Sequence, residues 1–161
     1  MRSYSAPIVI TTAFTAAIDV FELLAATGKP VELIAFEFGQ TSEVGDAQEE
    51  QLPLKLVRLS GSFTSGSGGG TSTFRRTAST NDTAPDVTLE TGNTTQAAAG
   101  SGTANEVADF VWNVRTSCLY VPVPEERFVL LPGEALALQM ISAPADSISA
   151  IRGRIVVREL V

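Results

Sequence analysis

The chain of 161 residues contains no histidine and a single cysteine. Without histidine, the usual general base and the commonest zinc ligand are both missing, and neither a Ser-His nor a Cys-His nucleophile can form. Cys118 has no partner for an internal disulfide, and the residues that follow it are typical of a strand. We interpret it as a buried small hydrophobe rather than a reactive thiol. The composition predicts a protein that is not an enzyme and that uses no metal and no cofactor.

Charged residues are also scarce, at 18% of the chain against 44% hydrophobic residues. The formal net charge is −7 and the isoelectric point is about 4.5, so the summed field repels phosphate. Only Arg75 and Arg76 form a basic pair, and direct binding to nucleic acid is not expected. So few charges leave part of a soluble surface apolar, which favours an oligomer or a larger assembly.

Long apolar runs are missing as well. Near the start of the chain, the apolar run is limited to Ile8, Val9 and Ile10, because Pro7 precedes it and Thr11 and Thr12 follow it. This run is far too short for a signal peptide or a membrane span. We expect no membrane and a cytosol-like place of synthesis.

Short blocks of alternating apolar and polar residues, separated by Gly, Pro, Ser and Asn, dominate what is present. In residues 31–38, Val31, Leu33 and Ala35 are expected to face one way and Ile34, Phe36 and Phe38 the other, which indicates a central strand. Residues 18–26 fit either a strand in a hairpin with 31–38 or the end of a helix over 14–26, and we favour the strand. Further strands are predicted at 52–59, 71–79, 87–91, 106–113, 116–123, 127–131, 135–143 and 147–160.

Spacing of this kind predicts a mostly β fold, an antiparallel two-sheet sandwich of jelly-roll type with roughly eight strands. We expect residues 1–161 to form one domain, with 60–105 as long Gly/Ser/Thr-rich loops and short strands. The run Gly66–Gly70 lacks the Lys-Ser/Thr ending of a phosphate loop and is interpreted as a flexible hairpin tip.

Acidic residues offer two further candidate sites. Glu43, Asp46, Glu49 and Glu50 can supply oxygen ligands, but their spacing matches no EF-hand, so we interpret them as a solvated loop. A carboxylate pair for glycoside hydrolysis needs two residues from Glu90, Glu106, Asp109, Glu125 and Glu126, and nothing selects one pair.

Candidate interface residues come from the apolar positions. Trp112 and Phe128 lie inside predicted strands and are interpreted as core or subunit-interface anchors. Residues 1–11, which contain Ile8, Val9 and Ile10, are interpreted as an extended arm that adds to the sheet edge of a neighbouring copy.

Motifs near both ends of the chain carry a family resemblance. They are Val123-Pro124-Glu125-Glu126-Arg127, the run from Leu131 to Leu138, Ala143-Pro144-Ala145 and the closing Ile155-Val156-Val157-Arg158-Glu159-Leu160, with Phe21–Ala26 and Val31–Ser42 near the start. This pattern resembles the small jelly-roll proteins of tailed-bacteriophage virions that decorate or cement the capsid.

The resemblance implies a homotrimer on the capsid surface that binds the major capsid protein or other virion proteins and is made in the host cytoplasm. A tail or head-fibre component is the alternative within the same class. A carbohydrate-binding β-sandwich module is the alternative from another class, and it requires an exposed aromatic platform.

Overall fold

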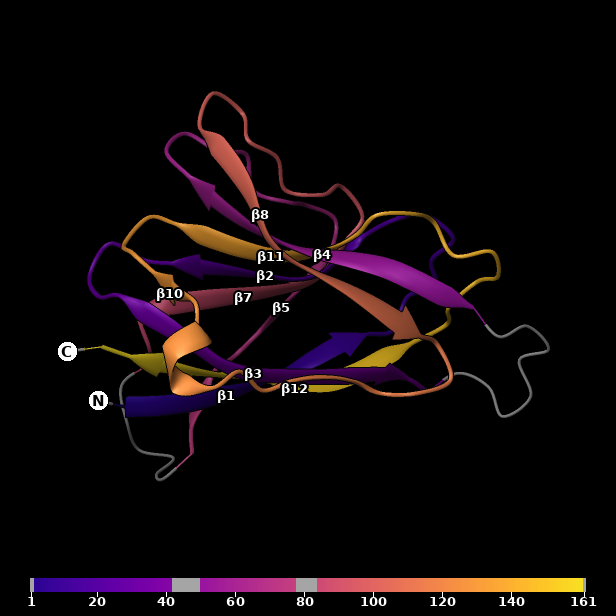
Figure 1. Cartoon of the computed structure of the whole chain (residues 1–161), viewed down its shortest axis with the longest axis horizontal. Coiled ribbons are helices and arrows are strands. Elements are labelled where there is room, and N and C mark those ends of the chain that lie inside the picture. Colours follow the sequence, from indigo (N-terminus) through magenta and orange to yellow (C-terminus); the bar gives the residue numbers. More distant parts are fainter. Residues whose placement is uncertain (1, 42–49, 78–83, 161) are drawn as a thin grey trace.

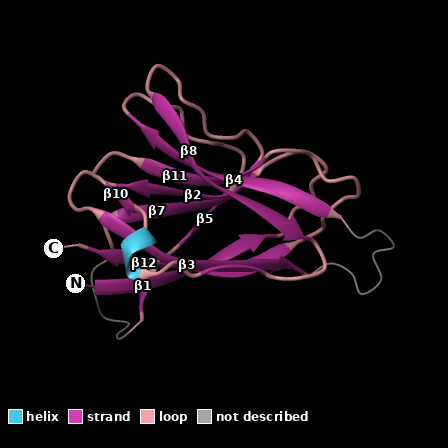
Figure 2. Ribbon diagram, in the orientation of Figure 1, coloured by secondary structure: helices cyan, strands magenta, loops and turns pink. Residues whose placement is uncertain are grey.

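The computed structural model describes residues 2–41, 50–77 and 84–160. Two six-stranded antiparallel sheets face each other (Figures 1 and 2), which confirms the predicted mostly β two-sheet sandwich. Sheet 1 has the order β10-β3-β12-β1-β6, with β9 also paired to β3, and sheet 2 has the order β5-β7-β2-β11-β4-β8. Among the described residues the one helix is the short 3-10 turn η1 (Pro124–Glu126), and no helix there is long and apolar enough to cross a membrane.

The strands number more than the predicted eight because short segments extend the edges of both sheets. Sheet 1 is formed by β1 (Arg2–Ile10), β3 (Val31–Gln40), β6 (Arg75–Arg76), β9 (Cys118–Tyr120), β10 (Val129–Leu130) and β12 (Ile151–Glu159). Sheet 2 is formed by β2 (Asp19–Ala25), β4 (Gln51–Ser60), β5 (Gly70–Ser72), β7 (Val87–Asn93), β8 (Thr103–Asn113) and β11 (Ala135–Met140). The five strands predicted in the C-terminal third are all present, as β8 to β12.

Residues 19–25 form a strand, as favoured over the helix, but the predicted hairpin with 31–38 is wrong. β2 pairs with β7 and β11 in sheet 2, whereas β3 pairs with β12, β9 and β10 in sheet 1. Apart from the half-buried Leu24, every residue of β2 is buried, so this strand needs a neighbour on each side and cover on both faces. The segment between β2 and β3 therefore crosses from one sheet to the other instead of turning within one sheet.

A β-bulge corrects the predicted faces of β3. Ala35 pairs with Val156 and Leu33 with Val157, so Ile34 has no opposite residue. One skipped residue reverses the alternation, and Leu33 and Phe36 consequently both reach the core. The prediction that Leu33 and Phe36 lie on opposite faces is wrong for this reason.

The predicted N-terminal arm lies inside sheet 1. Residues 2–10 pair along their whole length with β12, and Tyr4 and Ser5 also pair with β6. The segment is thus a strand of its own subunit and is not free to extend to a neighbour. Figure 1 shows the N- and C-terminal strands side by side.

The main core lies between the sheets and is built around aromatic side chains. The Phe36 ring lies 5.2 Å from Phe21 of the opposite sheet and 5.1 Å from Tyr120, and the Phe38 ring lies 5.0 Å from Trp112, all centroid to centroid. The Phe36–Phe21 and Phe38–Trp112 contacts cross the sandwich and fix the two sheets relative to each other, while the Phe36–Tyr120 contact lies within sheet 1.

A second apolar cluster lies on the outer side of sheet 2. Val57, Leu59, Ala135 and Ala137 pack there against Ala97, with Leu24 and Phe63 at its margin. Residues 61–69 and 94–98 cover this face, held to each other by the bridges Thr64–Ala98 and Ser67–Thr95. In the Gly/Ser/Thr-rich middle of the chain, residues 61–69 and 94–98 are therefore packed on the sheet, and the described residues of this segment also hold β5, β6, β7 and the start of β8. Gly66–Gly70, interpreted above as a flexible hairpin tip, is not an unattached tip, because Gly66 is buried and Gly70 begins β5.

Candidate interaction surfaces

The structure places most of the predicted interface residues in the core. Ile8, Ile10 and Trp112 are buried between the sheets, and Val9 and Phe128 are half-buried. Alternation along β1 directs Ile8 and Ile10 inward, and the Trp112 ring packs on Phe38 and donates its Nε1–H to the Thr116 carbonyl at 2.9 Å. Ile8, Ile10 and Trp112 therefore stabilise the subunit and present no surface to a partner.

The outer face of sheet 1 carries arginines in regular alternation. In β12, Ile151, Ile155 and Val157 point into the core, while Arg152, Arg154, Val156 and Arg158 point outward. Directly opposed residues of neighbouring strands share a face, so Ser5 and Pro7 of β1, Arg75 of β6 and Glu37 of β3 lie on the same outer side. We call this surface, with Leu119 and Val121, the arginine face.

Ion pairs neutralise part of the arginine face. Arg154 pairs with Glu37 at 2.8 Å and Arg158 with Glu32 at 2.7 Å. Arg152 and Arg75 are exposed, and no carboxylate of the described residues lies within 4 Å of either. Although the chain has a net charge of −7, this face carries a local excess of positive charge.

Two aliphatic side chains stand beside these arginines. Leu119 is 65% and Val121 61% exposed, and they line a shallow depression of about 40 Å³ with Ala35, Glu37, Arg154 and Val156. Leu119 pairs opposite Glu37, so it points outward next to the Arg154–Glu37 ion pair. Isolated exposed aliphatic residues are common, but two that flank one depression on a sheet face are a candidate contact.

A second candidate surface lies on the other sheet, where β8 forms an edge. We call it the β8 hollow: a depression of about 290 Å³ lined by Pro53, Leu54, Asp109, Phe110, Val111 and Ile141. Val111 is 67% and Ile141 52% exposed. Residues 103–113 contain Glu106 and Asp109 but no Lys or Arg, and β8 pairs with β4 along only one of its two edges.

Two buried carboxylates, Asp19 and Glu22, form a site that sequence reasoning missed. A bulge in β2 leaves Val20 between the partners of Asp19 and Phe21, which places Asp19 and Glu22 on the same outer face of sheet 2. Asp19 accepts hydrogen bonds from the Ala97 N–H at 2.8 Å and the Gln139 amide at 2.9 Å. Glu22 accepts from the Ser65 hydroxyl at 2.7 Å and the Gly66 N–H at 2.8 Å.

Burial dominates the titration of this pair. It raises the pKa of Asp19 from 3.8 to about 7, against the hydrogen bonds from Ala97 and Gln139, which lower it. Burial, with the nearby Glu90 carboxylate, also raises the pKa of Glu22. Both side chains are buried and accept hydrogen bonds from the segments that cover sheet 2. They therefore hold residues 65–66 and 97 on the sheet, and a substrate cannot reach them. A signal was present in the sequence: two acids inside the apolar block 18–26.

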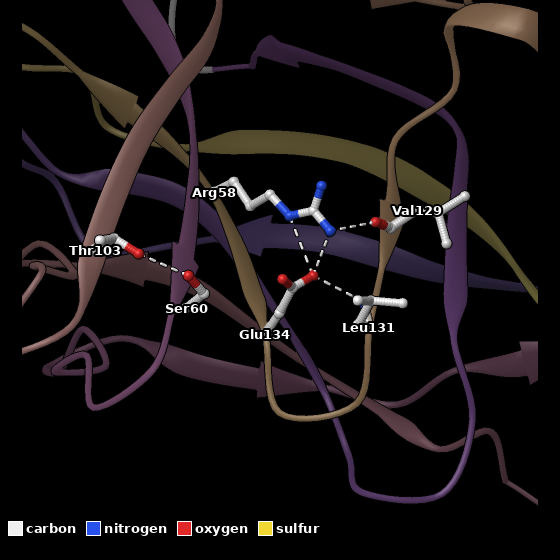
Figure 3. A network of polar contacts seen from close by, with 6 residues as sticks. All are labelled: Arg58, Ser60, Thr103, Val129, Leu131 and Glu134. Carbon is white, nitrogen blue, oxygen red and sulfur yellow. Dashed lines mark hydrogen bonds and ion pairs between the residues drawn. The ribbon is translucent and has the colours of Figure 1, made fainter.

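A further polar network holds the turn between β10 and β11 to β4 (Figure 3). The Arg58 guanidinium donates to the Glu134 carboxylate and, at 2.9 Å, to the Val129 carbonyl. The same Glu134 oxygen accepts the Leu131 N–H at 2.8 Å, and Ser60 and Thr103 join β4 to β8 through their hydroxyls at 2.7 Å. Because the carboxylate and guanidinium are both engaged, this network is structural.

The five carboxylates considered for glycoside hydrolysis, of which the sequence selected no pair, are spread over separate elements of the fold. Glu90 lies on β7 and accepts a hydrogen bond from Asn93 at 3.0 Å, whereas Glu106 and Asp109 lie on β8, and β2, β11 and β4 lie between these two strands. Glu125 and Glu126 are exposed in η1.

Cys118 is half-buried, and burial raises the pKa of its thiol to about 11, as expected for an unreactive residue.

The acidic candidate loop is described only at its end. Glu43, Asp46 and Glu49 lie outside the described residues, and the Glu50 carboxylate accepts the Ala145 N–H at 2.8 Å. Among the residues that the structure describes, no three His, Cys, Asp or Glu side chains are grouped so as to hold a metal ion.

A third depression, of about 270 Å³, lies where β1 ends, between Thr11, Thr12, Phe14, Gly68–Gly70 and Thr94. Its lining is uncharged, and Phe14 is buried. None of the eleven Phe, Tyr and Trp side chains, all of which lie in the described residues, is classed as exposed. A stacking platform of the kind that sugar-binding modules use is therefore missing.

Comparison with known proteins adds little. No family model matches the chain, and no curated protein matches it in sequence. Among solved structures, a chain of the VP16-VP17 complex, a complex of the two major capsid proteins of bacteriophage P23-77, is 9% identical over 94% of this chain and 87% of that chain, with a TM-score of 0.20. A TM-score this low supports no inference, so fold and function rest on the chain's own residues.

Proposed function

We propose that this chain is a non-enzymatic structural protein of a tailed-phage virion, a decoration or cement protein that binds the outer surface of the capsid and stabilises it. The sequence motifs at both ends of the chain resemble this class, and a two-sheet sandwich is the fold that the resemblance implies. Made in the host cytoplasm, it binds the major capsid protein and copies of itself, as a trimer.

One structural observation carries the proposal: four of the six exposed large apolar side chains among the described residues border two open surfaces rather than an enclosed cleft. Leu119 and Val121 stand on the arginine face, and Val111 and Ile141 at the β8 hollow. Broad surfaces with aliphatic centres and charged margins suit docking to other proteins. The buried carboxylates, by contrast, are fully engaged in hydrogen bonds within the subunit.

The test uses particles of the virus that encodes the chain. Heads and tails are separated on a density gradient, and the protein is measured by mass spectrometry in each fraction. Recovery with heads, together with density on the outside of the shell in a cryo-electron reconstruction, is the expected result. Recovery with tails supports the fibre alternative, and absence from both fractions refutes a virion role.

A second measurement tests cementing. Shells stripped of the protein are heated with and without the purified protein, and release of packaged DNA is followed by dye fluorescence. We expect the added protein to raise the temperature of release. Unchanged release at saturating protein would contradict a stabilising role.

A further inference from the structure

We propose that the chain associates with itself head to tail, with the arginine face of one copy seated in the β8 hollow of the next. Leu119 and Val121 of the first copy enter the hollow beside Val111 and Ile141 of the second. The contact is one between two different surfaces of the same protein. It specifies the self-association that the proposed function includes, and it can fail while the virion location, tested separately on particles, holds.

Shape and burial provide the first support. The hollow of about 290 Å³ has an apolar lining and a single carboxylate, Asp109. On the arginine face, Leu119 and Val121 are more than half exposed and line a depression of only about 40 Å³, so most of their apolar surface is open to solvent. An exposed aliphatic pair and an apolar hollow both lose unfavourable contact with water when they meet.

Charge provides the second and independent support. Arg152 and Arg75 are exposed without a carboxylate partner among the described residues. Glu106 and Asp109 lie on β8, which has no Lys or Arg, and Lys55 of β4 stands opposite Asp109, so this edge carries two carboxylates against one cation. Opposite charges at the margins of an apolar contact steer the two surfaces together and fix their register. Because the net charge of each copy is −7, the basic surface of one copy can be attracted to an acidic surface of another.

The same charges disfavour symmetric contacts. Two arginine faces that meet would set Arg152 and Arg75 against each other, and two β8 edges paired with each other would set Asp109 and Glu106 against their copies. Like charges at about 4 Å cost about 1 kcal/mol even in water. A head-to-tail contact avoids both arrangements, and such a contact closes into a ring when its rotation allows.

The test compares two single substitutions that each place a like charge in the contact. Leu119→Glu adds a negative charge that faces Asp109 and Glu106, and Val111→Lys adds a positive charge that faces the arginine face. Both side chains are exposed, and circular dichroism and thermal unfolding check that each variant folds. Leu131 is 53% exposed and lies on neither of the two surfaces. Leu131→Glu and Leu131→Lys therefore serve as matched controls.

Sedimentation equilibrium measures the mass of each protein. We expect the unmodified chain and both controls to associate at micromolar concentration, and each of the two test variants to raise the dissociation constant at least about tenfold. An equimolar mixture of Leu119→Glu and Val111→Lys should associate again, because each supplies the surface that the other has intact and the altered surfaces carry opposite charges. A symmetric contact through the arginine face predicts instead that Val111→Lys associates normally.

Three results would overturn the proposal. The first is an unmodified chain that stays monomeric up to about 100 µM. The second is a folded Leu119→Glu or Val111→Lys variant that associates like the controls. The third is a mixture of the two monomeric variants that does not associate. As a further check, Arg152→Glu should weaken association less at about 0.5 M salt than at about 0.05 M, since salt screens exposed charges.

Discussion

Replacing Asp19 with Asn should flatten the dependence of stability on pH. In the folded chain the pKa of Asp19 is raised from 3.8 to about 7, first of all by burial. A carboxyl with a raised folded-state pKa binds more protons folded than unfolded, so its contribution to stability is fully present below the unfolded pKa. The contribution is lost as pH rises from about 4 to about 7.

The magnitude follows from the same two values. A shift of about three units corresponds to about 4 kcal/mol in total, at 1.36 kcal/mol per unit. Of this, about 2–3 kcal/mol falls between pH 5 and pH 8. This range avoids the isoelectric point, where association is strongest. Glu22 contributes in the same direction, since its pKa is also raised, and it remains in the variant.

The assay is urea unfolding at intervals of pH from about 5 to about 8, followed by tryptophan fluorescence of Trp112. The free energy of unfolding of the unmodified chain should fall across this range, and that of Asp19→Asn should fall by about 2–3 kcal/mol less. The variant also loses a well-matched acceptor for Ala97 and Gln139, at a cost of about 1–3 kcal/mol that varies little with pH. Parallel pH profiles of the two proteins, or stability that rises with pH in the unmodified chain, would refute the reasoning.

Three further predictions concern packing and reactivity. Gly66→Ala should lower the free energy of unfolding by about 1–3 kcal/mol, because the added Cβ would lie 2.5 Å from the Asn93 amide nitrogen and 2.9 Å from Asp19 Oδ2. The matched control Gly70→Ala, whose Cβ would have no atom within 4 Å, should change the free energy of unfolding little. Equal effects of the two substitutions in urea unfolding would show that residue 66 is not packed. Trp112→Ala should cost about 3–5 kcal/mol by calorimetry, since the side chain is buried against Phe38, and a loss below about 1 kcal/mol would contradict a core position. Cys118 should react with iodoacetamide at pH 8 far more slowly than free cysteine, because its thiol has a pKa of about 11, and a rate equal to that of free cysteine would show that the thiol is open.

The local pattern of residues determined the class of the fold. Alternation with period two does not depend on which strands become neighbours, so the mostly β sandwich, the strand at 19–25 and the five C-terminal strands could all be predicted. The arginines at alternate positions of 151–159 could also be placed on one face, opposite Ile151, Ile155 and Val157.

Tertiary structure decided everything that depends on partners distant in the sequence. Nothing local specifies that β2 and β3 enter different sheets, or that residues 2–10 pair with 151–159 in the same subunit. Nor does local pattern reveal the skipped residues Ile34 and Val20, each of which reverses the faces beyond it.

The candidate surfaces follow the same division. The bulge at Val20 turns Asp19 and Glu22 together under residues 65–66 and 97, and only the assembled sheet raises their pKa values. Leu119 and Val111, two of several aliphatic residues in strand-like blocks, are exposed because they point away from the core, whereas Trp112, the residue after Val111 on the same strand, points inward and is buried. Which face of a strand is covered depends on how the two sheets pack, and sequence spacing alone does not contain that.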